Sequence, residues 1–399
     1  MREALKRCFV VPKTVYFDAS ATTPLDPAVG REMLPFFKAS FGNAGSLHSK
    51  GFEASAALAG ARSRVAAVLN CAPEEIVFTG SGTESVNLAL KGVAEKHAGK
   101  GGCIITTSIE HHAVLDSCKW LASRGFDVTV VGVGREGIVS VDDVVAAIKP
   151  STILVSVMYA NNEVGALQPV REVAAACRAN GVLFHTDACQ AGNSEVLAVR
   201  ELGVDLMTLN GSKIYGPKGV GCLYVRKGVA VAPQLHGGGQ EFGLRSGTEN
   251  VASLVGFAKA LELAQANRIA YVAKLVPLRD ELIAGLLKIP GAVLNGGASR
   301  RLANNVNVSF PGAEGESIVL RLDAEGICAS TGSACSSKSL EPSHVLLALG
   351  LSEELAHASV RFSLTKHATR QDVARVVAAT ARVVSELRAM SPVGSVANG

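Results

Sequence analysis

Short runs of apolar and β-branched residues alternate with helical patterns through the first two thirds of the 399-residue chain. The runs lie at residues 76–78, 103–107, 128–131, 153–158, 182–185 and 206–209. Segments between them, such as 51–69 and 170–179, repeat apolar residues at helical spacing. This alternation predicts an α/β fold with a mostly parallel central sheet flanked by helices, and it predicts a ligand site at the carboxyl ends of the strands.

After residue 250 the pattern changes to a long helical stretch up to about residue 287, strand candidates at 306–310 and 359–364, and a closing helix at 371–389. We therefore expect a large domain over residues 16–257 and a smaller α+β domain made of residues 1–15 and 258–399. The smaller domain contains a stretch of small and polar residues, 330–339, that is typical of a mobile loop, and Cys335 lies in it.

Composition excludes several classes of function. Lys and Arg number 39 against 35 Asp and Glu, and the net charge of +4 is too small to predict a nucleic-acid or anionic-membrane partner. No signal-peptide hydrophobic region precedes Pro12, and no uninterrupted apolar run is long enough to span a membrane. The nine cysteines are scattered without a C-x-x-C pair, so we expect no disulfide framework, no metal site and a reducing, cytoplasmic location.

Lys213 follows the strand candidate 206–209 and precedes a turn rich in Gly and Pro. Desolvation there would lower its pKa and make it a nucleophile able to form a Schiff base, although a lone lysine in a loop is more simply a surface residue. Asp187 ends another strand candidate, so its carboxylate would face the same crevice. In enzymes that use pyridoxal phosphate (PLP), an acid in such a place keeps the ring nitrogen protonated, although alone it is more often a helix cap.

Two further strand ends carry polar groups. Residues 79–85 join a strand to a helix, and their backbone N–H groups and hydroxyls would suit a phosphate, unless they form only a capping box. His111 follows the strand candidate 103–107, where an imidazole would stack on a cofactor ring or move protons.

Cys335 has no bulky apolar neighbour and lies near Lys338, a setting typical of a reactive thiol.

Ordered short motifs follow one another along most of the chain: YFDASATTP at 16–24, FGN at 41–43, SGTES at 81–85, EH at 110–111, NNEVG at 161–165, DACQ at 187–190, KIYGPKG at 213–219, HGGGQE at 236–241, RSGTEN at 245–250, GSAC at 332–335, EPSHV at 341–345 and RFS at 361–363. With these motifs the chain resembles the cysteine desulfurases of the class V aminotransferase family, in the branch that serves iron–sulfur and nitrogenase cofactor assembly.

The resemblance implies the type I fold of PLP-dependent transferases and a role for each motif. Lys213 would hold PLP, Asp187 would pair with the ring nitrogen, and His111 would stack on the ring. Asn162 and Gln190 would contact the phenolic oxygen of the cofactor.

The resemblance also implies how the phosphate and the substrate are bound. Groups from two turns would bind the phosphate: Gly82, Thr83, Asn210 and Ser212. Thr248 of a second subunit would join them, so the protein would be an obligate homodimer. The substrate carboxylate would be bound by Arg361, with Asn162 beside it. Relatives usually have serine and histidine where this chain has Asn210 and Ser212, so a phosphate-binding histidine is replaced by a shorter hydroxyl donor.

The implied reaction converts L-cysteine to L-alanine. Lys213 would remove the α-proton, and Cys335 would attack the substrate sulfur and keep it as a persulfide for an acceptor protein, such as an iron–sulfur scaffold. Two alternatives stay open: another PLP reaction on this fold, such as that of a selenocysteine lyase or an aminotransferase, and a scaffold that has lost catalysis.

Overall fold

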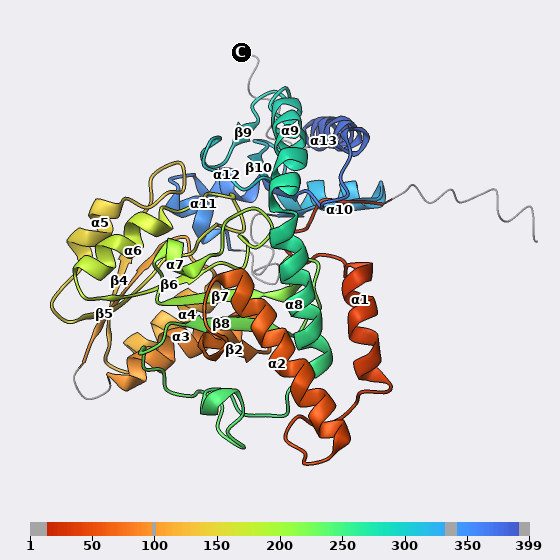
Figure 1. The fold of residues 1–399 in the computed structure, drawn as a ribbon. Coiled ribbons are helices and arrows are strands. Elements are labelled where there is room, and N and C mark those ends of the chain that lie inside the picture. Colours follow the sequence, from red (N-terminus) through yellow and green to blue (C-terminus); the bar gives the residue numbers. More distant parts are fainter. Residues whose placement is uncertain (1–13, 98–100, 332–340, 391–399) are drawn as a thin grey trace, which may run out of the picture. The chain divides into compact units, whose positions relative to one another are not determined.

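The computed structural model describes residues 14–97, 101–331 and 341–390, which form two compact units (Figure 1). The larger unit comprises Thr22–Asn162 and Ala166–Tyr271. The smaller unit comprises the described residues up to Ala21, then Glu163–Gly165, and the described residues from Val272 onward. The domain limits expected from the sequence, 16–257 against 1–15 with 258–399, stay a prediction.

A seven-stranded sheet forms the centre of the larger unit. Its strands lie in the order β2 (Ile76–Thr79), β8 (Gly221–Val225), β7 (Leu206–Asn210), β6 (Leu183–Asp187), β5 (Thr152–Ser156), β3 (Cys103–Thr107) and β4 (Asp127–Val131). All neighbours pair in parallel except β8, which runs antiparallel to both β2 and β7. The prediction of an α/β fold with a mostly parallel sheet is confirmed.

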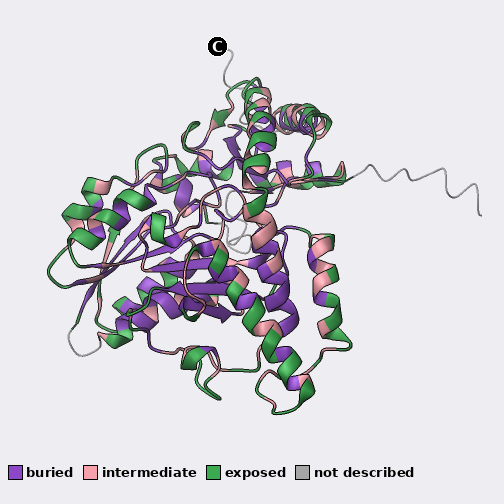
Figure 2. Ribbon diagram, viewed as in Figure 1, coloured by how far each residue is buried: buried purple, intermediate pink, exposed green. Residues whose placement is uncertain are grey.

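Helices cover both faces of this sheet because successive strand residues point to opposite sides. Val77 and Ile104 pack on one face with residues of α3 (Gly82–Lys96) and α4 (His112–Ala122). Phe78 and Ile105 pack on the other face with α2 (Ser49–Leu69), α6 (Val170–Ala179) and α8 (Val251–Ala266). Figure 2 shows the central strands as mostly buried. The remaining helical segments of this unit are α1 (Pro27–Met33), η2 (Leu34–Phe37), η3 (Pro73–Glu75), α5 (Val141–Ala147), α7 (Val199–Leu202), η4 (Gly211–Lys213) and η5 (Glu241–Gly243).

The smaller unit contains a four-stranded antiparallel sheet in the order β12 (Ser330–Thr331), β13 (Ser359–Ser363), β10 (Asn305–Ser309) and β9 (Val293–Leu294). A parallel pair joins β1 (Val15–Tyr16) to β11 (Ile327–Cys328). Its helices are α9 (Arg268–Leu286, from Val272 on), α10 (Gly315–Ala324), α11 (His344–Ala348), α12 (Glu353–His357) and α13 (Arg370–Met390). Among the helices that the structure describes, none is both long and apolar enough to cross a membrane.

Candidate active site

Polar side chains gather at the carboxyl edge of the large sheet. Asp187 ends β6, Asn210 ends β7, and His111 follows β3 after a short turn. These strands run parallel within one sheet, so their carboxyl ends open at the same edge. The charges of Asp187 and Lys213 both act on the His111 imidazole, which places the three side chains close together.

The Asp187 carboxylate is fixed where β6 ends. Its Oδ1 atom accepts the Cys189 N–H at 3.0 Å, and its backbone carbonyl accepts the Tyr159 N–H at 2.8 Å. The residue is only 7% exposed, so its charge is little screened by solvent. A carboxylate held in this way can pair with one positively charged group at the sheet edge.

A buried polar network lies two residues before Asp187 on the same strand. The ring nitrogens of His185 are 2.9 Å from Ser156 Oγ and 3.0 Å from Thr208 Oγ1, on the strands to either side. Burial lowers the pKa of His185 to about 4, against the opposing charge of Asp187, so the ring is neutral near pH 7. The network ties β5, β6 and β7 together beneath the site.

His111 is the N-cap residue of α4. Its Nδ1 atom accepts the Ala113 N–H at 3.1 Å, so in the neutral ring the proton sits on Nε2. Burial lowers the pKa of His111, the Asp187 carboxylate opposes this effect, and His112 and Lys213 add to it. The site therefore presents a neutral imidazole with an Nε2–H donor.

Lys213 belongs to the 3-10 turn η4, which follows β7 directly. Asn210 caps this turn by accepting the Ser212 N–H at 2.9 Å, and Asn193 Nδ2 donates to the Lys213 carbonyl at 2.8 Å. The Thr23 hydroxyl and N–H both donate to the Ser212 carbonyl, at 3.0 and 2.8 Å. The backbone that carries Lys213 is thus held from several sides.

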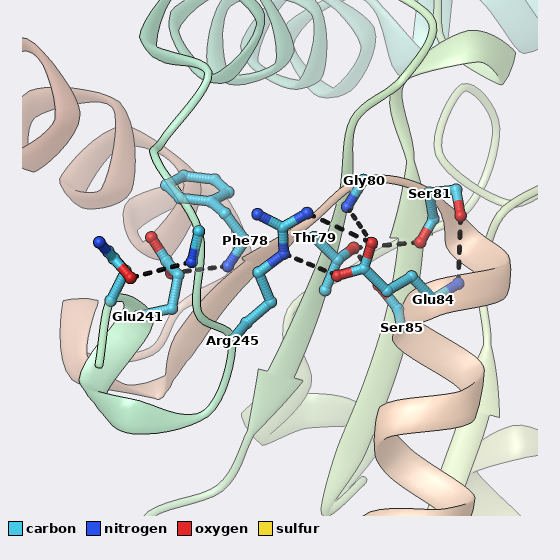
Figure 3. A network of polar contacts seen from close by, with 10 residues as sticks. Phe78, Thr79, Gly80, Ser81, Glu84, Ser85, Glu241 and Arg245 are labelled. Atoms are coloured by element: carbon cyan, nitrogen blue, oxygen red, sulfur yellow. Dashed lines mark hydrogen bonds and ion pairs between the residues drawn. The ribbon is translucent and has the colours of Figure 1, made fainter. Parts of the chain in front are cut away.

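The N-terminus of α3 has backbone N–H groups of the kind that can bind an anion, and it is called the anion cradle below; Figure 3 shows the polar contacts around it. Ser81 caps the helix by accepting the Glu84 N–H at 3.1 Å, and the first helical turn leaves the N–H groups of Gly82 and Thr83 without helical partners. A Cβ atom on Gly82 would lie 2.8 Å from Cys189 Sγ, so a larger residue here would require Cys189 to shift. This contact places the cradle next to the turn that follows Asp187.

Together, these groups suit one kind of ligand. The cradle suits a phosphate, the lysine suits an aldehyde, and the Asp187 carboxylate suits a protonated ring nitrogen. The arrangement fits a small aromatic cofactor that carries all three groups.

Glu110 is a site residue that the sequence interpretation missed. It is fully buried, and its Oε1 atom accepts hydrogen bonds from Thr107 Oγ1 and from the Met158 N–H, both at 2.8 Å. Burial raises the pKa of Glu110 to about 8, opposed by these two donors, and the charge of Asp187 raises it further. The signal in the sequence was a glutamate directly before His111. Its partner Thr107 is only three residues away, but its partner Met158 lies beyond the end of β5 and could not be identified without the fold.

The other predicted residues of the larger unit are less enclosed. Asn162, Gln190 and Ser212 are half-buried, and all three lie in turns at the carboxyl edge of the sheet. Thr248 is exposed, on the segment between η5 and α8.

Arg361 lies in the smaller unit, on β13, where it is 2% exposed. Its Nη2 atom is 2.8 Å from Asp18 Oδ1. Glu163 of the same unit accepts the Ser343 hydroxyl proton at 2.5 Å. Burial raises the pKa of Glu163 to about 7, while the Ser343 hydrogen bond and the charge of Arg361 oppose this. Cys335 lies outside the described residues.

Comparison with known proteins gives consistent relationships. The family described as Aminotransferase class-V matches residues 15–376. A cysteine desulfurase IscS from Methanosarcina thermophila is 50% identical over 380 residues, covering 95% of this chain and 94% of its own. One from Dictyoglomus turgidum is 47% identical over 381 residues, covering 95% and 97%. A solved NifS-like protein aligns with a TM-score of 0.89 at 39% identity, over 94% of this chain and 100% of its own. The structure of SspA in complex with cysteine aligns with a TM-score of 0.79 at 37% identity, over 89% and 100%.

Proposed function

The chain belongs to the class V aminotransferase family, and from this premise we propose that it is a PLP-dependent cysteine desulfurase, which converts L-cysteine to L-alanine and keeps the sulfur as a persulfide on Cys335. Relatives named cysteine desulfurase that match nearly the whole chain at about half identity support the reaction.

The observation that carries the proposal is the convergence of an acid, a lysine and an anion cradle at one sheet edge. PLP has a ring nitrogen, an aldehyde and a phosphate, and these match Asp187, Lys213 and the N-terminus of α3. The residues present therefore fit the cofactor. Gly82, Thr83, Asn210 and Ser212 would hold the phosphate, and Asn162 and Gln190 would contact the phenolic oxygen.

Bound PLP supplies an electron sink for the negative charge that forms at the substrate α-carbon. Asp187 would keep a proton on the ring nitrogen, and the neutral His111 ring would lie against the cofactor. Lys213 would hold the cofactor through Nζ, and the same nitrogen, once the substrate has displaced it, would take the α-proton.

The sulfur step uses two further residues. Arg361 would bind the substrate carboxylate, with Asn162 beside it, because a planar guanidinium donates two parallel hydrogen bonds to a carboxylate. The Cys335 thiolate would attack the substrate sulfur, so that a sulfur–sulfur bond forms as the carbon–sulfur bond breaks. Protonation of the remaining carbon skeleton gives alanine, and the enzyme keeps one sulfur.

We also infer that the protein forms a homodimer. One stretch of the larger unit exposes the large apolar side chains Leu34, Phe37, Phe41, Leu47 and Phe52. Burial against a second copy of the chain would remove these side chains from water. In that dimer the exposed Thr248 would complete the phosphate site of the second subunit.

The persulfide would pass to an acceptor protein, and an iron–sulfur scaffold is the acceptor we propose. A reducing compartment such as the cytoplasm suits this chemistry, because Cys335 must be a reduced thiol before it can attack the substrate sulfur. The cysteines within the described ranges are free thiols.

The test is mass spectrometry of the PLP-loaded protein after brief exposure to L-cysteine without reductant. Wild type is compared with Cys335→Ser, and alanine is quantified in both. We expect wild type to gain one sulfur on Cys335 and to release alanine, whereas the variant keeps its PLP and does neither.

Two other outcomes would favour the alternatives. Equal alanine release from Cys335→Ser would favour a lyase, because the attacking thiol would then be dispensable. No product from either protein would favour a scaffold or another substrate.

A further inference from the structure

The segment from Glu241 to Arg245 contacts strand β2 through a hydrogen bond and the first turn of α3 through an ion pair (Figure 3). Glu241 Oε1 lies 2.6 Å from Arg62 Nη2, and Glu241 Oε2 accepts the Phe78 N–H at 2.8 Å. Arg245 Nε lies 2.8 Å from Glu84 Oε1. The segment therefore contacts the end of strand β2, before the anion cradle, and the first turn of α3, after it.

The Glu84 carboxylate disfavours the binding of an anion in the cradle. It lies in the first turn of α3, and its Oε2 atom accepts the Gly80 N–H at 2.9 Å. The carboxylate therefore stays beside the helix N-terminus, and a negative charge there repels a bound anion. The Arg245 guanidinium contacts both carboxylate oxygens, at 2.8 and 3.5 Å, and brings the opposite charge to the same place.

The backbone that presents Arg245 is held in an unusual conformation. Glu241 and Phe242 have φ values of 49° and 58°, a region that residues other than glycine rarely adopt. The Arg62 guanidinium lies between two rings, 4.8 Å from the Phe78 centroid and 4.9 Å from the Phe242 centroid, and also binds Glu241. Such strain persists only where surrounding contacts fix the conformation.

We propose that Arg245 is a positioning residue of the cofactor site, which holds Glu84 and cancels its charge so that the N-terminus of α3 can bind a doubly charged phosphate. This inference rests on the proposed function only in naming PLP as the ligand that carries the phosphate. The charge balance itself concerns any phosphate in the cradle.

The test separates charge from anchoring. Full-length holoenzyme of wild type, Arg245→Ala, Glu84→Gln and the double variant is stripped of cofactor, and its dissociation constants for PLP and, separately, for inorganic phosphate are measured. Arg226→Ala is the matched control, because Arg226 pairs with Asp205 at the opposite edge of the same sheet, with Nε 2.6 Å from Oδ1.

We expect Arg245→Ala to weaken the binding of both ligands roughly tenfold, the effect of one partly screened charge. Glu84→Gln should bind as tightly as wild type or more tightly, and the double variant should return to within about threefold of wild type. High salt should shrink the defect of Arg245→Ala, because it screens the uncancelled Glu84 carboxylate. The control should bind like wild type.

A double variant as weak as Arg245→Ala, with a defect that salt does not change, would overturn the inference, and Arg245 would then only anchor its segment. Unchanged binding in Arg245→Ala would overturn it as well. If wild type and the variants bind inorganic phosphate with the expected differences but wild type takes up no PLP, the proposed function fails and the inferred charge balance stands. Wild type that binds neither ligand contradicts both.

Discussion

The Glu110 carboxyl group lies inside the larger unit, bonded to Thr107 and Met158, and its raised pKa of about 8 makes it a neutral acid at pH 7. Because the folded pKa is above the unfolded value of 4.5, the folded state binds this proton more tightly. The stability that Glu110 contributes is therefore fully present below pH 4.5 and is lost as the pH rises through about 8.

We predict that Glu110→Gln removes this dependence. Relative to wild type, the variant should gain free energy of unfolding between pH 5 and pH 8, by up to about 1.4 kcal/mol for each pH unit. Urea unfolding of the cofactor-free protein at several pH values measures the difference. Glu354→Gln, at an exposed carboxyl group on α12, is the control. Parallel pH profiles of wild type and Glu110→Gln would contradict the prediction.

Ser212 supports a second prediction at this scale. Serine and histidine can both donate a hydrogen bond to a phosphate oxygen, so Ser212→His should leave desulfurase activity intact. The rate of alanine release and the dissociation constant of PLP measure the effect. A complete loss of activity would count against the phosphate position proposed for this turn.

At the residue scale, the sequence could indicate groups that end a strand, but not groups that depend on distant partners. Asp187 and Lys213 follow apolar runs, so they were expected at the sheet edge, where the structure has them. The contact between Arg245 and Glu84 joins residues 161 positions apart, and no local sequence pattern predicts it. Cys335 remains a prediction from motif and chemistry.

The turns that follow the strands are tightly packed, and at Gly82 they leave little room for a side chain. A Cβ atom at this position would meet Cys189 Sγ at 2.8 Å, at the junction of the β2–α3 turn with the turn after β6. We predict that Gly82→Ala lowers the free energy of unfolding by about 1–3 kcal/mol, the usual cost of overpacking.

The companion change Cys189→Ala should recover most of that loss, because it removes the sulfur that the new methyl group meets. Gly60→Ala on α2 is the control: nothing lies within 4 Å of a Cβ atom there, so it should be neutral or stabilising. Urea unfolding of all four proteins gives the comparison. An equal loss with and without Cys189 would show that the strain has another source.

Among the elements, those with a continuous pattern were predictable and those set by context were not. The strand expected at 103–107 and the helix expected at 170–179 have these bounds in the structure. The strand β8 was not expected, because its five residues follow a turn rich in glycine and it pairs antiparallel with its neighbours. The long helical stretch after residue 250 is two helices, which break at Asn267.

For the whole molecule, the proposed dimer gives a further prediction. Phe41 is 71% exposed in the apolar stretch of the larger unit, and Phe41→Asp would place a charge in the proposed interface. We expect a shift from dimer to monomer and weaker PLP binding, since Thr248 would then be lost from the site of the second subunit. Sedimentation velocity measures the first effect and cofactor titration the second.

The control is Ile269→Asp, because Ile269 is 75% exposed in the same unit but lies outside that stretch. It should leave both the association state and the cofactor affinity unchanged. A Phe41→Asp protein that remains a dimer would place the interface elsewhere.

The contact of Glu241 with Phe78 has a consequence for the behaviour of the protein at high concentration. β2 is the outermost strand on one side of the large sheet, and its outward N–H at Phe78 is taken by a carboxylate. A strand of another molecule would need that N–H to extend the sheet, and it would meet a charged side chain instead. At the other outermost strand, β4, Asp127 carries an ion pair with Lys149 at 2.7 Å. Both edge strands of the sheet therefore carry charged side chains that disfavour the pairing with another molecule from which aggregation begins.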